Sequence, residues 1–425
     1  MQLKKPISIG AALSTAAYSL LSHAADKAWD IETTALIYAE RDRVKVNEDV
    51  VKVKVDQGNE KTFTLTGIID VMTGASPTGA SKLGVGNIYT SPSGGAFTAD
   101  ANKIPVAEFS DRRFAAHAAW DRPWSKNARS TYGVDFSDEV DYSSLGGSFN
   151  LTGDFFEKMT SLTVGVSGNY DRVRPVNGVP IGLKSGSDKT GSYELDRKAG
   201  LQGLVGLTQV LNRRALVQLN FTLATQSGYL NDPYKVVSYG NVKSNDLQNY
   251  YFESRPQSRT SKIFYGKLNY AREDGGFVSM AGRYYSDDWK LRAATADMKF
   301  EQPMGGPDEY AGLHVRFSRQ SAASFYHYQL TDDVNSPDYV GYVLLTFPGD
   351  TTALKSEKVP YVSADYRLAR LDTLTFGAKY HRPVNWFDMK MILDTRAEWM
   401  GQFDRSKNLD PLYALILQIA LKFKY

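Results

Sequence analysis

Residues 411–425 read PLYALILQIALKFKY, and their side chains alternate in polarity with period two up to the final aromatic residue. Successive side chains of a β-strand point to opposite faces, so the alternation divides this strand into two faces. The apolar face carries Tyr413, Leu415, Leu417, Ile419, Leu421, Phe423 and Tyr425. The other face carries Ala414, Ile416, Gln418, Ala420, Lys422 and Lys424. Because a tilted strand of about 9 to 11 residues crosses a bilayer, the stretch predicts the closing strand of an outer-membrane β-barrel.

The beginning of the chain has the pattern of a secretory signal peptide. Lys4 and Lys5 precede an apolar run over residues 7–21, and Ser22-His23-Ala24 supplies a small-residue cleavage site. The run is too short for a permanent membrane helix. We therefore expect residues 1–24 to be a signal peptide and residues 25–425 to form the exported barrel.

The composition is consistent with export and with a barrel. The 425 residues include no cysteine, which excludes disulfides and Cys-x-x-Cys metal, haem or thiol-redox sites. The mean hydropathy of -0.37 is too polar for a bundle of membrane helices, whereas a barrel exposes only every second strand residue to lipid. With 50 basic and 47 acidic residues, the net charge of +3 gives no indication of nucleic-acid binding.

The same alternation recurs along the whole mature chain. Clear examples lie at residues 145–155, 162–170, 215–225 and 391–399. A single soluble core could not bury so many one-sided strands. We therefore predict an all-β, antiparallel transmembrane barrel of about 16 strands, within a range of about 14 to 18.

Turn residues divide these strands. Tight turns are predicted at residues 57–60, 126–127, 274–276 and 370–373. Long loops are predicted near residues 74–105, 174–191, 227–256 and 331–358. The segment 74–105 is either a surface loop or an inward constriction. Short and long connections stop alternating over residues 331–411, so the sidedness of the strands stays open there.

Aromatic residues near the predicted strand ends indicate belts at the membrane interfaces. These residues are Trp120, Trp124, Tyr132, Tyr142, Trp289, Trp386 and Trp399.

Two groups of charged residues are expected to line the lumen. Asp135, Glu139 and Asp141 are predicted to share one strand face, opposite apolar neighbours. There they would pair with Arg112, Arg113 or Arg129, or else bind a cation. Asp394, Arg396 and Glu398 occupy the polar face of residues 391–399, which also suits a hydrated interior.

The sequence contains no recognisable active site. The histidines of the mature chain are scattered singly, without metal-ligand spacing, and the glycine-rich run at residues 79–86 lacks the strand-to-helix setting of a phosphate loop. We therefore predict no catalytic residues, no cofactor-binding residues, no metal ligands and no enzymatic activity.

Three blocks of sequence resemble a proteobacterial family catalogued as a domain of unknown function. They are residues 32–44 (ETTALIYAERDRV), 65–80 (LTGIIDVMTGASPTGA) and 135–144 (DFSDEVDYSS). The resemblance implies an outer-membrane β-barrel whose gene often lies beside those of an FAD:protein FMN transferase, a thioredoxin-like protein and a small lipoprotein. It thereby implies a link to extracytoplasmic redox or flavin processes and assigns no functional residues.

The main hypothesis is an integral barrel in the outer membrane of a Gram-negative bacterium. It would be a channel for a small solute, or a scaffold for a periplasmic partner such as a redox or flavin protein. Its other expected partners are outer-membrane lipid and the barrel-assembly machinery, for which Phe423 and Tyr425 would be the assembly signal. An outer-membrane hydrolase and a soluble periplasmic β-protein are the alternatives.

Overall fold

A computed structural model describes most of the mature chain. The described residues are 29–81, 88–90, 96–98, 104–184, 194–241, 246–306, 308–331, 333–336, 338–339, 343–347, 350–355, 360–386 and 389–424. The predicted signal peptide at residues 1–24, and Tyr425, lie outside them.

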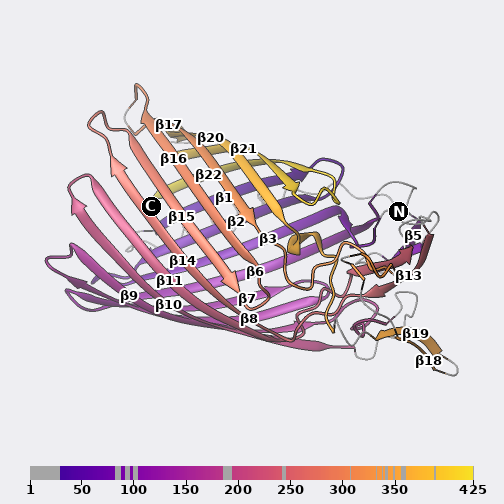
Figure 1. Ribbon diagram of the computed structural model, residues 1–425. Helices are drawn as coiled ribbons and strands as arrows, with labels where there is room; N and C mark the ends of the chain where they lie inside the picture. Colours follow the sequence, from indigo (N-terminus) through magenta and orange to yellow (C-terminus); the bar gives the residue numbers. More distant parts are fainter. Residues whose placement is uncertain are drawn as a thin grey trace.

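Sixteen antiparallel strands form one closed barrel, as predicted (Figure 1). The first eight strands in barrel order are β1 (Trp29–Glu40), β2 (Lys45–Asp56), β3 (Thr62–Pro77), β6 (Val106–Ser125), β7 (Ala128–Asp138), β8 (Tyr142–Phe155), β9 (Thr160–Val173) and β10 (Asp196–Asn212). The next eight are β11 (Ala215–Gly228), β14 (Ser258–Ala271), β15 (Phe277–Asp287), β16 (Arg292–Pro303), β17 (Tyr310–Gln320), β20 (Leu371–Trp386), β21 (Met389–Asp404) and β22 (Leu412–Lys424).

The long connections carry secondary structure of their own. Three short hairpins are β4 (Ile88–Thr90) with β5 (Ala96–Thr98), β12 (Val236–Asn241) with β13 (Asp246–Phe252), and β18 (Val343–Phe347) with β19 (Asp350–Lys355). A 3-10 helix, η1, spans Tyr366–Leu368. No helix among the described residues has both the length and the apolarity needed to cross a bilayer.

The barrel closes because the last strand pairs with the first. β22 runs antiparallel to β1 from Asp30 opposite Lys424 to Glu40 opposite Ala414. β22 is thus hydrogen-bonded on both sides, to β1 and to β21. Closure removes the free sheet edges, which no strand can expose within a membrane.

Strand alternation separates an apolar outer face from a polar inner face. Leu415, Leu417 and Ile419 are exposed, whereas the residues between them are half-buried. The other walls repeat the pattern, with Val164 and Leu313 among the most exposed apolar side chains. A soluble protein would not expose so many large apolar residues, and in lipid this surface is buried.

The two ends of the barrel differ in the length of their connections. Short turns lie at the end where the described chain begins and ends, and the four long connections, 78–105, 174–195, 229–257 and 321–370, lie at the other (Figure 1). In outer-membrane barrels the short turns face the periplasm and the long loops face outward. This settles the sidedness of residues 331–411, because β20 pairs with β17 across the longest connection.

Two predicted connections differ from the structure. β3 pairs with β6 as far as Pro77 opposite Val106, so the long connection begins at residue 78 and not at Gly74. The segment 370–373 is not a hairpin turn, because Leu371 already pairs with Asp404 in the β20–β21 ladder. Polar and turn-forming residues are compatible with strand ends, where pairing to a neighbour decides their conformation.

Aromatic side chains gather on the outer face near both ends of the barrel. Trp120, Tyr132 and Phe149 lie next to one another on β6, β7 and β8, with ring centroids 5.9 and 5.2 Å apart. Trp399 stacks with Phe376 and Tyr413 toward the opposite end. Of the predicted belt residues, Trp289 is instead buried beneath the loops, and Tyr142 packs against Val173, Val179 and Tyr229. The side chain of Trp386 lies outside the described residues.

Two adjacent residues of β22 test the assignment of the faces. Ile419→Arg places a charge on the lipid face and should lower the free energy of unfolding by about 2–4 kcal/mol near the bilayer midplane. Gln418→Arg, on the inner face, should change it much less. Urea titration of the barrel folded into lipid vesicles measures both, and equal losses would contradict the assigned faces.

Candidate functional site

The loops at the outer end of the barrel pack against one another. The 229–257 and 321–370 connections share isolated β-bridges at Tyr239–Leu330 and Ser254–Val362. Their buried apolar residues form a small core: Val237, Tyr239, Tyr251, Leu330, Val362 and Ala364. These two connections therefore form one packed unit.

This unit reaches the other side of the barrel mouth. The backbone N–H of Val236 donates to the Thr78 carbonyl at 2.9 Å, and that of Ser81 donates to Ser238 Oγ at 2.9 Å. The sheet order places β3 six strands away from β11, so the 229–257 connection crosses the mouth to reach the end of β3. Gly79 permits the approach, because a Cβ on this residue would lie 2.4 Å from the Val236 carbonyl oxygen.

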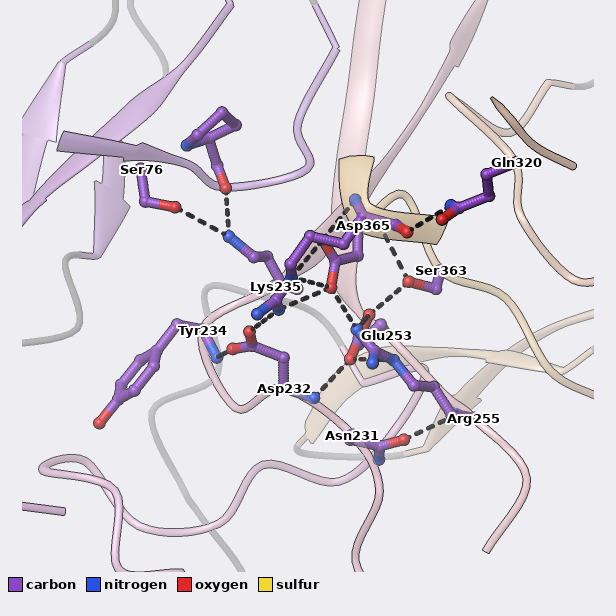
Figure 2. Close-up of polar contacts among 12 residues, drawn as sticks. Ser76, Asn231, Asp232, Tyr234, Lys235, Glu253, Arg255, Gln320, Ser363 and Asp365 are labelled. Carbon is purple, nitrogen blue, oxygen red and sulfur yellow. Dashed lines mark hydrogen bonds and ion pairs between the residues drawn. The ribbon is translucent and has the colours of Figure 1, made fainter. Parts of the chain in front are cut away.

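Six charged loop residues join at this crossing in what we call the mouth network, and Figure 2 labels all of them except Arg367. Its members are three acids and three bases: Asp232, Glu253, Asp365, Lys235, Arg255 and Arg367. Arg255 contacts Glu253 at 2.7 Å and Asp365 at 2.8 Å. Arg367 contacts Asp365 at 2.6 Å and Asp232 at 2.5 Å.

Lys235 links the mouth network to the barrel wall. Its Nζ donates to Ser76 Oγ at 3.3 Å and to the Pro77 carbonyl, both at the end of β3. The same Nζ lies 5.9 Å from the centre of the Tyr366 ring, which Arg43 also approaches, at 5.1 Å. Residues from two connections, 229–257 and 321–370, are thus held at the end of β3 by one set of charges.

Burial and charge shift the acids of the mouth network in opposite directions. Burial raises the pKa of Glu253 to about 7, against the pull of Arg255. Burial would also raise the pKa of Asp365, but Arg367 outweighs it and holds that pKa well below its ordinary value. Lys235 and Arg367 likewise lower the pKa of Asp232 despite its burial. Glu253 is therefore the acid of the network that titrates near neutral pH.

A second polar cluster lies on the inner wall, where Glu398 and Arg396 are found. His314 on β17 bonds through Nδ1 to Glu398 at 2.5 Å and through Nε2 to Asp297 at 2.8 Å. Glu398 also accepts from Arg396 Nε at 2.7 Å. Gly377 lies between His314 and Glu398 in the sheet, and a Cβ there would come within 2.6 Å of Glu398 Cγ. The missing side chain lets the pair meet across β20.

Asp394 belongs to a neighbouring set of contacts on the same wall. It lies 2.9 Å from Lys422 Nζ, 2.6 Å from His381 Nδ1 and 3.7 Å from Lys379 Nζ. Lys422 also reaches Glu32 on β1 at 3.7 Å. These side chains lie on the strand faces opposite the exposed apolar residues, and ion pairs therefore connect β20, β21, β22 and β1 from within.

The structure separates Asp135 from Glu139 and Asp141, although the three were predicted to share a strand face. Asp135 lies on β7 and bonds His117 Nδ1 at 2.6 Å. Glu139 and Asp141 lie beyond the end of β7, in a turn closed by the Glu139 N–H and the Tyr142 carbonyl at 2.7 Å. The strict alternation assumed from the sequence ends at Asp138, because the backbone reverses there.

Two of the three arginines predicted as partners form their ion pairs with other acids. Arg113 pairs with Asp70 on β3, and Arg129 lies 3.9 Å from Glu60. Asp141 instead accepts a hydrogen bond from the Tyr234 hydroxyl.

Glu139 and Asp141 meet a third carboxylate at the mouth. Ligand oxygens of Asp111, Glu139 and Asp141 all lie within 4.8 Å of one another. Burial, followed by the charge of Asp111, raises the pKa of Glu139 to about 7. Such a group offers the oxygen ligands that hard cations accept, but half-buried acids alone do not define a metal site.

Sequence reasoning missed the mouth network entirely. Its pairs join residues 110 positions apart for Arg255–Asp365 and 135 apart for Arg367–Asp232. In the sequence each of these charged residues lies in a polar loop, where a charged side chain is normally expected to be exposed to solvent. The one local hint is the apolar setting of residues 235–239 (KVVSY) and 360–366 (PYVSADY), where a single charge accompanies residues that pack.

These features together define an integral β-barrel of the Gram-negative outer membrane: a closed barrel, an apolar outer face with aromatic belts and a charged interior. The family described as "Protein of unknown function (DUF3570)" matches residues 9–404, and the chain belongs to this family. The family predicted from the three sequence blocks is thereby confirmed. No curated protein matches the chain.

Several solved outer-membrane proteins are similar in fold. OccK5 (OpdH) of Pseudomonas aeruginosa is 8% identical with a TM-score of 0.42, over 94% of this chain and 98% of that chain. OpdK of the same organism, solved with vanillate, is 8% identical with a TM-score of 0.41, over 94% and 99%. The outer membrane transporter YddB of Escherichia coli is 9% identical with a TM-score of 0.36, over 89% and 60%. At these values the similarity does not bear on what this chain binds.

The mouth network makes the loops sensitive to pH. The pKa of Glu253 is higher in the packed loops, about 7, than its ordinary value of 4.5, so packed loops bind the proton more tightly. Loop packing should therefore weaken as the pH rises from 4.5 toward 7. Hydrogen exchange in residues 229–257, corrected for intrinsic rates, should show more protection at low pH than at high pH.

Glu253→Gln should flatten this dependence. Glu139→Gln is the matched control, because Glu139 has a similarly raised pKa but lies outside the mouth network. An unchanged dependence in Glu253→Gln would contradict the assignment.

Proposed function

We propose that the protein is a passive channel for small polar solutes across the outer membrane, with a mouth narrowed by its own loops. The observation that carries the proposal is the inner wall. Charged side chains meet along it, as in the contacts of Asp394 with Lys379, His381 and Lys422, while apolar side chains face lipid. Barrels of about 16 strands are wide enough for an aqueous lumen.

The mouth network gives the loops a role in this channel. Loops tied only to their own strand ends would leave the mouth open. Here Lys235 and the Val236 N–H attach the 229–257 connection to the far strand end, and Arg255 and Arg367 attach it to the 321–370 connection. Breaking a buried ion pair by removing one partner costs about 3–5 kcal/mol, because the other charge stays buried and unpaired. The network therefore keeps the loops across the opening.

Planar-bilayer recording of the purified barrel should show stepwise conductance. Asp365→Ala leaves Arg255 and Arg367 without a shared carboxylate, so the loops should loosen and the conductance should rise and become noisier. Asp372→Ala is the matched control, because this Asp pairs with Arg319 on the outer face and not in the network. Identical traces from both variants would contradict the role of the loops.

A barrel that shows no conductance in planar bilayers would favour the scaffold alternative, in which the periplasmic turns bind a partner protein. The redox or flavin partner suggested by the family resemblance would then be sought by crosslinking from those turns. A heat-modifiable band on gels would show that the silent protein is folded.

We also infer that the protein is not an enzyme. The arrangement most like a catalytic triad is Asp135–His117 beside Ser148, which approach one another over Gly133. Among the described residues Ser148 makes no hydrogen bond to His117, and a hydrolase needs its nucleophile within reach of the base. Hydrolysis of lipid or peptide by the purified barrel that disappears in His117→Ala would contradict this inference.

The end of β22 is proposed as the signal for barrel assembly. Phe423 packs against Ile31 of β1 at the seam, and Tyr425 follows two residues later. Phe423→Asp combined with Tyr425→Asp should leave the chain in the periplasm, because the last strand loses its apolar end. Unchanged outer-membrane levels after fractionation would contradict the assignment, and Lys424→Asp at the same end is the control.

A further inference from the structure

Four basic residues from four adjacent strands surround one spot on the inner wall. Lys267 of β14, Arg283 of β15, Lys299 of β16 and Arg316 of β17 make up what we call the basic patch. Lys267, Ala281, Asp297 and Arg316 form one row across the four strands. Arg283 and Lys299 each lie two residues along a strand from a member of that row. Lys267 and Arg316 are the two ends of the row, Arg283 and Lys299 lie on opposite sides of it, and all four side chains line the same cavity.

Small side chains leave room among these cations. Ala281, Ser279, Thr295 and Ser318 occupy the positions between them. The resulting cavity has a volume of about 480 Å³. Ligand pockets for small molecules commonly measure about 300–1,000 Å³. Ala281 lies near the middle of β15 and Asp297 near the middle of β16, so the cavity opens midway through the membrane.

The charge of the basic patch is mostly uncompensated. Asp297 is the carboxylate of this cavity, and its Oδ2 already accepts from Arg316 at 2.8 Å and contacts His314 at 2.8 Å. Within the described part of the chain, Lys267 and Lys299 form no ion pair, and Arg283 contacts only the Tyr285 ring, at 5.5 Å. Three cations therefore have no protein carboxylate to pair with.

Other cations of the inner wall differ from the basic patch because they are paired. Three cations on the inner wall of β20, β21 and β22 do meet acids: Lys379 meets Glu301, Arg396 meets Glu398 and Lys422 meets Asp394. Clustered unpaired cations repel one another, and that repulsion is relieved by a bound anion. Hydroxyls of Thr295 and Ser318, which lie 3.0 Å apart, add hydrogen-bond donors at the edge of the cavity.

We propose that the basic patch binds a small anion with at least two negative charges on oxygen, such as a dicarboxylate or a phosphate ester. The inference rests on the proposed channel and names the class of solute that it favours. Three unpaired cations match a multiply charged ligand better than a single carboxylate. The guanidinium of Arg283 suits bidentate contact with a carboxylate or a phosphate, and the two lysines supply point charges.

Ion selectivity tests the inference in an open channel. In a KCl gradient the wild-type reversal potential should indicate anion preference, and succinate or inorganic phosphate should reduce the chloride current. Lys267→Gln combined with Lys299→Gln should remove the preference and the block. Lys262→Gln is the matched control, because Lys262 is on the same strand but pairs with the outward-facing Leu223. A cation-selective wild type, or block that survives the double substitution, would overturn the proposal.

A binding measurement separates this inference from the channel itself. Calorimetric titration of the detergent-solubilised barrel with succinate and with inorganic phosphate at low salt requires no conduction. The double variant should bind either anion at least about tenfold more weakly, because two charges near the ligand are lost. Conductance without anion binding would contradict the proposed anion site but not the proposed channel. Anion binding by a barrel that does not conduct would contradict the channel but not the anion site. The anion that binds more tightly shows whether the site prefers a dicarboxylate or a phosphate.

Discussion

Every backbone polar group of a membrane-spanning strand must be hydrogen-bonded within the protein, and the rest of this structure depends on that constraint. An open sheet would leave two edges in lipid, so β22 has to return to β1. Closure then divides every strand into a lipid face and an interior face. The interior cannot be filled by apolar residues in a barrel of this width, and it carries the charges of β20, β21 and β22.

The loops at the mouth follow the same rule, that polar groups removed from water need partners within the protein. Charges removed from water are stable only when they are paired, and the mouth network pairs three acids with three bases from segments far apart in the chain. Burial still disfavours the charged form of Glu253, and it raises the pKa of this carboxyl to about 7. The basic patch differs from the mouth network, because three of its four cations are unpaired. Its cations line a hydrated cavity and have too few carboxylates, which is the arrangement expected where the missing charge arrives with a ligand.

The fold was largely predictable from the sequence, and the site was not. The strands at residues 145–155, 162–170 and 391–399 were read correctly, because alternation is a local property imposed by the two environments of the wall. The errors came where tertiary pairing overrides local chemistry. Leu371 begins a strand despite turn-like neighbours, and Glu139 leaves the strand face because the backbone turns after Asp138.

The sequence by itself determined that the chain is a membrane barrel, since period-two alternation requires only neighbouring residues. It also placed Asp394, Arg396 and Glu398 together on one strand face. Only the tertiary structure decided their partners, because His314 reaches Glu398 across Gly377 of a third strand. Only the tertiary structure likewise decided that Lys235 holds the far rim of the barrel and that Lys267, Arg283 and Lys299 share one cavity. Contacts between distant segments depend on strand register and barrel closure, and neither is encoded within a single strand.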